Sequence, residues 1–341
     1  MRLGVLTGGG DCPGLNPALR AIVMRAMDYG DECVGIRMGW AGLIRREVGP
    51  LTLEMVEDII SRGGTILESS RANPFKRDED LEATLRNIEE LKLDVVLALG
   101  GEDTLGAAHK LFNLGVNTVG IPKTMDNDLN CTDYTFGFDS AAQVATESAD
   151  RLRDTARSHR RVMVLEVMGR HAGWVALKSG VAGGADWILI PEVALDLDEM
   201  CTHLTKLRER GKNHGLVVVS EGVEITEAEH TTATSDDFGH VILRERGVGE
   251  FIAKEIEERT GFETRLAVLG HIVRGGSPTA FDRMLATRLG IKAVDLVHDG
   301  KFGYMSSLTS NQYIGVPLED AVSELKTVPH ELYEEIKTLF K

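Results

Sequence analysis

RLGVLTGGGDCPGLN, residues 2–16, places a short apolar run directly before three consecutive glycines. The run at 2–7 has the composition of a buried strand. Glycines after a strand let backbone N–H groups approach a ligand closely, and the N-terminus of a following helix favours an anion. The spacing matches neither a GxGxxG fingerprint nor a loop that ends in Gly-Lys-Ser/Thr. The stretch therefore predicts a strand and a phosphate-binding loop, with a tight structural turn as the alternative.

The same strand–loop–helix pattern recurs along the chain. Apolar runs that predict strands lie at 2–7, 94–99, 117–121, 162–167, 187–190, 216–220 and 266–269. Amphipathic stretches that predict helices lie at 81–93, 140–158, 197–210 and 248–259. Alternation of apolar strands with helices predicts an α/β fold whose parallel sheets are covered on both faces. With 341 residues the chain is long enough for two lobes, and we expect the polar stretch 224–239 to be a surface loop.

Bulk composition restricts the class of partner and the compartment. The formal net charge of −15 argues against a nucleic-acid partner, since phosphate backbones require a basic surface. No apolar run approaches the roughly 18 residues that a membrane span needs, and the N-terminal residues lack the features of a signal peptide. The four cysteines are scattered without a CxxC pair, which is typical of free thiols. We therefore expect a cytoplasmic protein without membrane contact.

Two further strand ends carry polar groups. The loop GGEDT after the run at 94–99 contains the adjacent acids Glu102 and Asp103, which suit Mg²⁺, although Asp103 or Thr104 would also serve as a helix cap. The next loop, PKTMDND, contains Lys123, Thr124, Asp126 and Asp128. An ionised Asp near a hydroxyl can act as a general base, whereas an isolated loop of this type is more often an Asx-rich turn.

The later predicted strands end in similar loops, which are VMGRHAG (167–173), SEG (220–222) and GHIVRGG (270–276). Around the last of them, Arg265, His271 and Arg274 form a set of cations suited to a phosphomonoester. A solvated salt bridge would explain any one arginine, but it does not explain polar loops at successive strand ends. Ligands of open α/β sheets lie at the carboxyl ends of the strands, so these loops predict one site.

Six segments together resemble the 6-phosphofructokinase family. They are GVLTGGGDCPGLN, GGED, PKTMDND, VMGRHAGW, SEG and VLGHIVRGGSPTAFDR, and they follow the family's order from Arg2 to about Leu289. The resemblance implies phosphoryl transfer to the 1-hydroxyl of fructose 6-phosphate, with Mg²⁺. It also implies two similar doubly wound α/β lobes with mainly parallel sheets and the active site in the cleft between them. Residues 1–137 would form the donor-binding lobe, completed by about 273–323, and residues 138–272 the fructose 6-phosphate lobe, completed by about 324–341.

The resemblance also implies roles for individual residues. Asp126 would be the base, with Thr124 and Asp128 beside it at the reacting centre. The donor phosphate would contact Gly9 and Gly10, and Glu102 would hold the metal. The sugar phosphate and the transferring group would contact Met168, Gly169, Arg170, Glu221, His271 and Arg274. Arg161 and Arg265 match arginines that reach into the neighbouring subunit's site, which implies a homodimer or homotetramer.

Two positions bear on the phosphoryl donor. Asp103 stands where ATP-using relatives carry glycine, and its carboxylate would repel the α-phosphate of a nucleotide. Lys123 stands where many short-chain ATP users also carry glycine, and it would neutralise charge on the transferring or leaving phosphate. Long-chain ATP users can carry this lysine too, so Asp103 carries most of the inference. We therefore predict pyrophosphate as the donor, in a reversible reaction of glycolysis or gluconeogenesis.

Three other functions stay open. The first is an ATP-dependent 6-phosphofructokinase. The second is a nicotinamide-dinucleotide kinase, which shares a glycine–acid loop but would leave VMGRHAGW and GHIVRGG without a role. The third is a non-catalytic metabolite sensor, which would not need an intact Asp126 and its complete set of arginines. Turnover by the purified protein separates the sensor from the enzymes.

Overall fold

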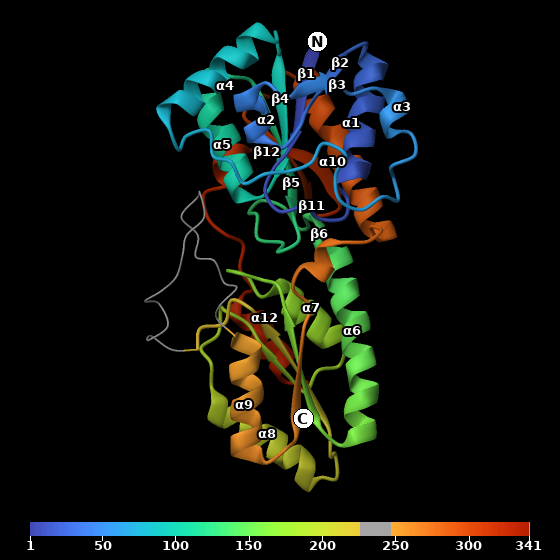
Figure 1. Cartoon of the computed structure of the whole chain (residues 1–341), viewed down its shortest axis with the longest axis vertical. Helices are drawn as coiled ribbons and strands as arrows, with labels where there is room; N and C mark the ends of the chain where they lie inside the picture. Colours follow the sequence, from blue (N-terminus) through green and yellow to red (C-terminus); the bar gives the residue numbers. More distant parts are fainter. Residues whose placement is uncertain (226–246, 341) are drawn as a thin grey trace.

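The computed structural model describes residues 1–225 and 247–340. The chain forms two lobes, each built on its own sheet with helices on both faces (Figure 1). Most of the predicted surface loop at 224–239 lies outside the described residues. No described helix is long and apolar enough to cross a membrane.

The larger lobe is built on an eight-stranded sheet with the order β12-β11-β5-β4-β1-β2-β3, to which β6 adds by pairing with β5. Its strands are β1 (Arg2–Thr7), β2 (Glu32–Ile36), β3 (Val48–Pro50), β4 (Val95–Gly100), β5 (Thr118–Thr124), β6 (Phe136–Gly137), β11 (Tyr304–Thr309) and β12 (Gln312–Pro317). All pairs are parallel except β2–β3 and β11–β12. The carboxyl ends of β1, β4 and β5 therefore meet at one edge.

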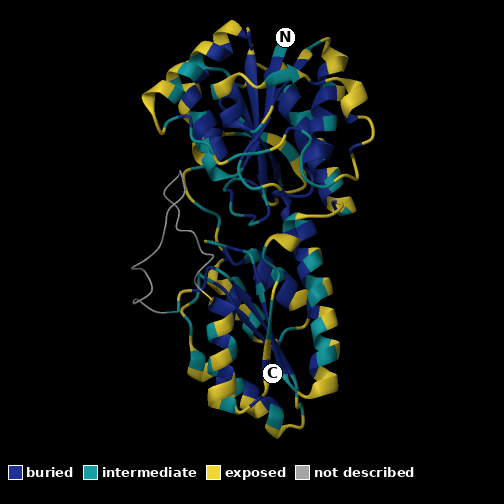
Figure 2. Cartoon of the chain, in the orientation of Figure 1, coloured by how far each residue is buried: buried dark blue, intermediate teal, exposed yellow. Residues whose placement is uncertain are grey.

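Helices cover both faces of this sheet because successive strand residues point to opposite sides. The helices of the lobe are α1 (Leu15–Tyr29), α2 (Trp40–Arg45), α3 (Leu53–Val56), α4 (Asp78–Glu90), α5 (Glu102–Asn113), α10 (Ala280–His298) and α11 (Leu318–Ala321). In β4, Leu97 and Leu99 join the core under α1 and α10, whereas Val96 and Ala98 join the core under α2, α4 and α5. The inner strands β1, β4 and β5 are accordingly buried along almost their whole length, whereas the edge strands β3 and β12 are not (Figure 2).

The smaller lobe is built on a four-stranded parallel sheet with the order β10-β7-β9-β8. Its strands are β7 (Val162–Val167), β8 (Trp187–Leu189), β9 (Gly215–Ser220) and β10 (Thr264–Val268). Its helices are α6 (Phe138–His159), α7 (Trp174–Ala182), α8 (Leu197–Glu209), α9 (Val248–Thr260), α12 (His330–Lys337) and the 3₁₀ helix η3 (Gly270–Arg274). The predicted class, an α/β fold with mainly parallel sheets, is confirmed. The residue boundaries assigned to the two predicted lobes stay a prediction.

The predicted strands all form, and those at 2–7 and 162–167 have the predicted bounds. One difference affects the site, because β5 continues to Thr124 and so places Lys123 and Thr124 in the strand. The sequence did not predict β2, β3, β6, β11 and β12. In β11 the buried residues include the polar Ser306 and Ser307, which weakens the apolar signal of a strand.

Candidate active site

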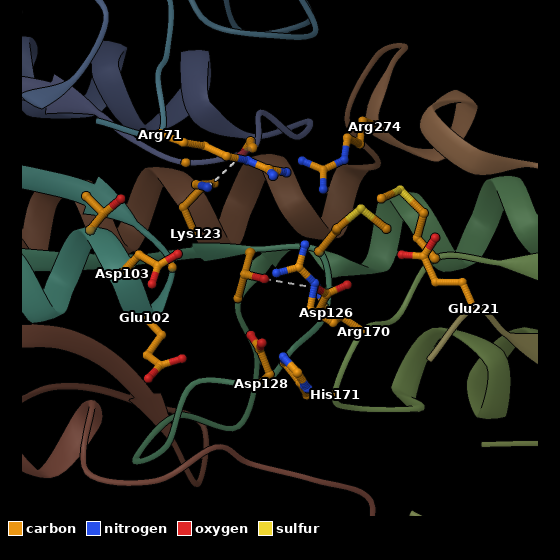
Figure 3. A pocket seen from close by; sticks show the side chains of 17 residues that line it. Arg71, Glu102, Asp103, Lys123, Asp126, Asp128, Arg170, His171, Glu221 and Arg274 are labelled. Carbon is orange, nitrogen blue, oxygen red and sulfur yellow. Dashed lines mark hydrogen bonds between the residues drawn. The ribbon is translucent and has the colours of Figure 1, made fainter. Parts of the chain in front are cut away.

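A cavity lies at the strand ends where the two lobes meet (Figure 3). The larger lobe contributes the loops after β1 and β4 and the end of β5, and the smaller lobe contributes those after β7 and β9. The lining residues are Gly9, Gly10, Arg71, Gly101, Glu102, Asp103, Thr104, Lys123, Thr124, Met125, Asp126, Asp128, Met168, Arg170, His171, Glu221 and Arg274. The loops predicted from strand ends thus converge on one site.

The glycine loop after β1 needs its glycines because other groups pack directly against it. A Cβ atom on Gly8 would lie 2.6 Å from Thr104 Oγ1, and one on Gly10 would lie 1.6 Å from Arg274 Nη1. Gly9 has φ +77°, which side chains rarely adopt. Arg274 is the last residue of η3. Its guanidinium therefore lies against the glycine loop of the larger lobe.

Lys123 provides a second cation beside the same loop. Its side chain is buried, and Nζ donates a 2.6 Å hydrogen bond to the carbonyl oxygen of Gly10. Burial lowers the pKa of the Lys123 ammonium, because a charge is less stable away from water. An anion placed beside Lys123 would offset that cost. Figure 3 shows Arg71, Lys123 and Arg274 around one part of the cavity, with the acids below them.

The acids Asp126 and Asp128 follow β5. The backbone N–H of Asp126 donates to Thr124 Oγ1 at 3.1 Å, and the buried Asn127 side chain accepts from the Thr135 N–H at 3.0 Å. These bonds fix the loop so that both acids reach the cavity (Figure 3). Burial raises the pKa of Asp126, although Arg274 and Arg170 oppose the rise. Burial and the neighbouring Asp126 charge raise the pKa of Asp128 to about 7.

The smaller lobe closes the other side of the cavity with the segments at 168–171 and 220–222. Gly169 has φ +149°, and its carbonyl oxygen accepts a 2.6 Å hydrogen bond from Ser220 Oγ. A Cβ on Gly222 would lie 2.1 Å from the carbonyl oxygen of Arg170. The two loops are therefore in direct contact, which fixes Arg170 and Glu221 relative to each other. Burial, and next the charge of Asp126, raise the pKa of Glu221 to about 7.

The residues present fit a bound Mg²⁺ that is completed by substrate. Within residues 1–225 and 247–340, no three His, Cys, Asp or Glu side chains group as ligands of one ion. Mg²⁺ commonly takes only one or two carboxylates, with water and substrate phosphates as its other ligands. Asp128 Oδ1 is buried without a hydrogen-bond partner, and Glu102 lines the same cavity. An oxygen of this kind is suited to a cation.

The loop after β4 does not use its polar residues as a cap. The N-cap residue of α5 is Gly101, so neither Asp103 nor Thr104 occupies the capping position. Glu102, Asp103 and Thr104 form the first turn of α5 and line the cavity instead. The helix N-terminus would favour an anion there, but two carboxylates already supply negative charge.

Four residues predicted for the site do not line this cavity. Gly169 lies between two residues that do, whereas His271 is exposed on η3. Arg161 and Arg265 both pair with Glu263, at 3.2 Å and 2.6 Å, beside strands β7 and β10. Because β10 is an edge strand, these two arginines lie at the border of the smaller sheet. Their predicted roles stay predictions.

The sequence analysis missed three polar residues that line the cavity, which are Arg71, Thr104 and His171. Thr104 and His171 lie inside loops already singled out at strand ends, so their position was a usable signal. Arg71 follows no strand. It reaches the site because the Gly9 N–H donates to the Ser70 carbonyl oxygen at 3.0 Å, which joins two segments far apart in sequence.

Cations and acids gathered at the strand ends of two α/β lobes define a phosphotransferase. A family model described as Phosphofructokinase matches residues 2–297. The pyrophosphate–fructose 6-phosphate 1-phosphotransferase of Dictyoglomus thermophilum is 53% identical over 343 residues, covering 100% of this chain and 99% of the relative. ATP-dependent 6-phosphofructokinase 3 of Streptomyces coelicolor is 48% identical over 338 residues, covering 98% of each chain.

A solved structure agrees on the fold. The pyrophosphate-dependent phosphofructokinase from Marinobacter aquaeolei aligns with a TM-score of 0.81 over 99% of this chain and 91% of that one, at 22% identity. The chain belongs to the phosphofructokinase family, and it is a phosphotransferase enzyme.

Proposed function

We propose that the protein transfers a phosphoryl group from pyrophosphate to the 1-hydroxyl of fructose 6-phosphate, reversibly, giving fructose 1,6-bisphosphate and phosphate. The observation that carries this proposal is the position of Asp103, which lines the cavity in the first turn of α5. Its carboxylate would repel the α-phosphate of a nucleotide, whereas pyrophosphate has none. Relatives at 53% and 50% identity bear the name of the pyrophosphate enzyme, which supports the same donor.

In this proposal Asp126 accepts the proton of the attacking hydroxyl. The residue lines the cavity, and the bond from its N–H to Thr124 fixes the turn that carries it. Burial raises its pKa, which makes the carboxylate more basic, while the charges of Arg274 and Arg170 oppose that rise. Asp126 therefore combines the position and the basicity that proton abstraction requires.

Cations stabilise the phosphoryl group as it moves. Such transfer depends on positioning and charge neutralisation rather than on covalent catalysis. Lys123, Arg170 and Arg274 all line the cavity, from β5, the loop after β7 and η3. The backbone N–H groups of Gly9 and Gly10 would contact the donor phosphate, and Asp128 and Glu102 would hold Mg²⁺. The metal would neutralise charge on the pyrophosphate.

The sugar phosphate would bind on the side of the smaller lobe. Met168, Arg170 and Glu221 line that side, with Gly169 between them in sequence. His271 and Arg274 would hold the 6-phosphate, together with Arg161 and Arg265 of a neighbouring subunit. The location of these two arginines outside the cavity of their own chain supports a shared site. We therefore propose a homodimer or homotetramer that works in the cytoplasm, in glycolysis or gluconeogenesis.

ATP-dependent phosphofructokinase is the second candidate, because relatives at 48% identity bear that name. Phosphorus NMR separates the two. Purified protein with Mg²⁺ and fructose 6-phosphate should convert pyrophosphate into sugar bisphosphate and phosphate, and should make pyrophosphate when started from those products. The same protein should leave ATP almost unchanged. Conversion of ATP alone would reject the proposed donor.

A further inference from the structure

A second cavity, of about 640 Å³, lies at the junction of the lobes, in a region that the proposed reaction does not use. It is built by the segment 132–138, by α7, and by residues near the C-terminus, and Figure 1 shows α7 in the smaller lobe on the side that faces the junction. Its lining residues are Asn127, Thr132, Asp133, Tyr134, Phe138, Trp174, Leu177, Lys178, Val181, Ala182, Lys326 and Ile336. The volume is within the range of small-molecule sites.

The walls of this junction cavity are mainly aromatic and aliphatic. The rings of Tyr134 and Phe138 stack with their centroids 6.2 Å apart. Trp174 begins α7 of the smaller lobe, and Val181 of the same helix is 40% exposed. Flat apolar ligands gain both buried area and ring stacking in such surroundings. The walls therefore favour a ligand that is flat and largely apolar.

Lys326 adds a cation that forms no ion pair within residues 1–225 and 247–340, although the charges of Asp133 and Asp128 act on it from nearby. Its Nζ donates to the carbonyl oxygens of Thr132 and Asp133, at 2.8 Å and 3.0 Å, and lies 5.8 Å from the centre of the Trp174 ring. Burial lowers the pKa of this ammonium to about 8. The other lysine of the cavity, Lys178, differs because it pairs with Asp139 at 2.7 Å.

The cavity also adjoins the back of the catalytic loop. The Lys326 backbone N–H donates to the carbonyl oxygen of Asp128 at 2.8 Å, and Trp174 Nε1 donates to the carbonyl oxygen of Lys326 at 2.9 Å. Asn127, between the two acids of the site, lines the cavity itself. An occupant would thus contact groups that hold the loop from the side opposite to the substrates.

We propose that the junction cavity binds a small aromatic monocarboxylate, whose ring packs between Trp174 and the Tyr134–Phe138 pair. Its carboxylate pairs with the ammonium of Lys326. The apolar walls select the ring, and the ammonium of Lys326, which forms no ion pair with a described residue, selects the negative charge. A neutral analogue would leave Lys326 without an anion, and a cationic analogue would be repelled. This binding needs no turnover, so it stands or falls independently of the proposed donor.

Isothermal titration calorimetry with 2-naphthoate tests the proposal on the full chain. We expect one saturable site, with at least about tenfold weaker binding of the neutral 2-naphthamide. Lys326→Met keeps the length of the side chain and should weaken 2-naphthoate about tenfold. Val181→Trp, which narrows the cavity at an exposed position, should weaken it similarly. Lys254→Met, on the exposed face of α9, is the matched control and should change nothing.

Arg274→Ala reports whether the probe binds in the central cavity instead. Binding that this variant abolishes, while Lys326→Met leaves it unchanged, would overturn the proposal. Equal affinity for the acid and the amide would do the same, since it removes the role of Lys326. Absence of any binding would overturn the proposal as well. Loss in both Lys326→Met and Val181→Trp, with Arg274→Ala unaffected, supports the proposal.

Discussion

Lys123 Nζ donates a 2.6 Å hydrogen bond to the carbonyl oxygen of Gly10, which ties the end of β5 to the glycine loop after β1. The two residues are 113 positions apart in sequence, and their bond connects the ends of β5 and β1, the third and fifth strands in the sheet order, at the cavity. The bond places a buried cation next to the backbone that would hold the donor phosphate. The glycine loop that would bind the donor and the lysine that would neutralise its charge are thus held together by this hydrogen bond.

Lys123→Met should therefore reduce turnover with pyrophosphate by about 10²-fold, because it removes a cation directed at transition-state charge. Folding should not suffer in proportion. Burial already disfavours the ammonium, so an apolar side chain of similar length should leave the melting temperature equal or higher. Steady-state kinetics and thermal melts of the same preparation check both statements. A variant with normal turnover would remove Lys123 from the reaction.

Asp126→Ser should lower turnover by about 10²–10⁴-fold while leaving the affinity for fructose 6-phosphate roughly unchanged. The loss arises because no other group would accept the hydroxyl proton at that position. Asp58→Asn, at an exposed site, serves as the control and should behave like the wild type. Equilibrium binding of the sugar phosphate separates chemistry from affinity. If the serine variant turns over at near-normal rate in folded form, another base must act.

The buried acids predict how stability depends on pH. Asp128 and Glu221 have pKa values of about 7 in the folded chain, whereas unfolded carboxyl groups titrate near pH 4. Between about pH 4 and 7 the folded protein therefore holds protons that the unfolded chain has lost. These groups should make the free energy of unfolding fall as the pH rises through that range. Asp128→Asn should flatten that fall and raise the melting temperature above pH 7. Thermal melts without substrate or Mg²⁺ measure it, and an unchanged pH profile would contradict the raised pKa.

If Arg161 and Arg265 act in the site of a neighbouring subunit, two inactive variants should restore each other's activity when their subunits mix. Mixed subunits of Asp126→Ser and Arg265→Ala should form hybrid sites in which one chain supplies the base and the other supplies the arginine. Partial activity should then return after the two proteins are unfolded and refolded together. Two Asp126→Ser preparations refolded together are the control and should stay inactive. Verified hybrids without activity would show that each site is built from one chain.

Much of the site could be predicted because parallel strands bring their carboxyl ends to one edge. The segments 101–104 and 125–128 follow the neighbouring strands β4 and β5, so local sequence was enough to predict that Glu102, Asp103, Asp126 and Asp128 lie together. Gly9 and Gly10 follow β1, which pairs with β4 in the same edge. These residues could be predicted because each of them directly follows a strand, and because those strands are neighbours in the sheet.

Other features depend on contacts that no local pattern carries. Arg71 reaches the cavity through a backbone bond between Ser70 and Gly9, two segments separated by the whole of β2 and β3. The guanidinium of Arg274 lies against Gly10, whereas His271, three residues earlier on η3, is exposed. Residues three apart lie on the same face of a 3₁₀ helix, so the position along η3 decides that Arg274 enters and His271 does not. The sequence predicted only that cations follow a strand. The junction cavity was missed because Trp174 and Lys326 meet only in the folded chain.

The donor is the central claim, and it rests on the Asp103 carboxylate in the cavity. The ratio of kcat/KM for pyrophosphate to kcat/KM for ATP, at equal Mg²⁺, tests it most directly when wild type is compared with Asp103→Gly. We predict a wild type that uses pyrophosphate well and ATP hardly at all. The glycine variant should admit some ATP and lose pyrophosphate efficiency, so the ratio should drop at least about tenfold, since relief of like-charge repulsion is worth kilocalories. A wild type that prefers ATP, or a ratio that Asp103→Gly leaves unmoved, would contradict the pyrophosphate assignment.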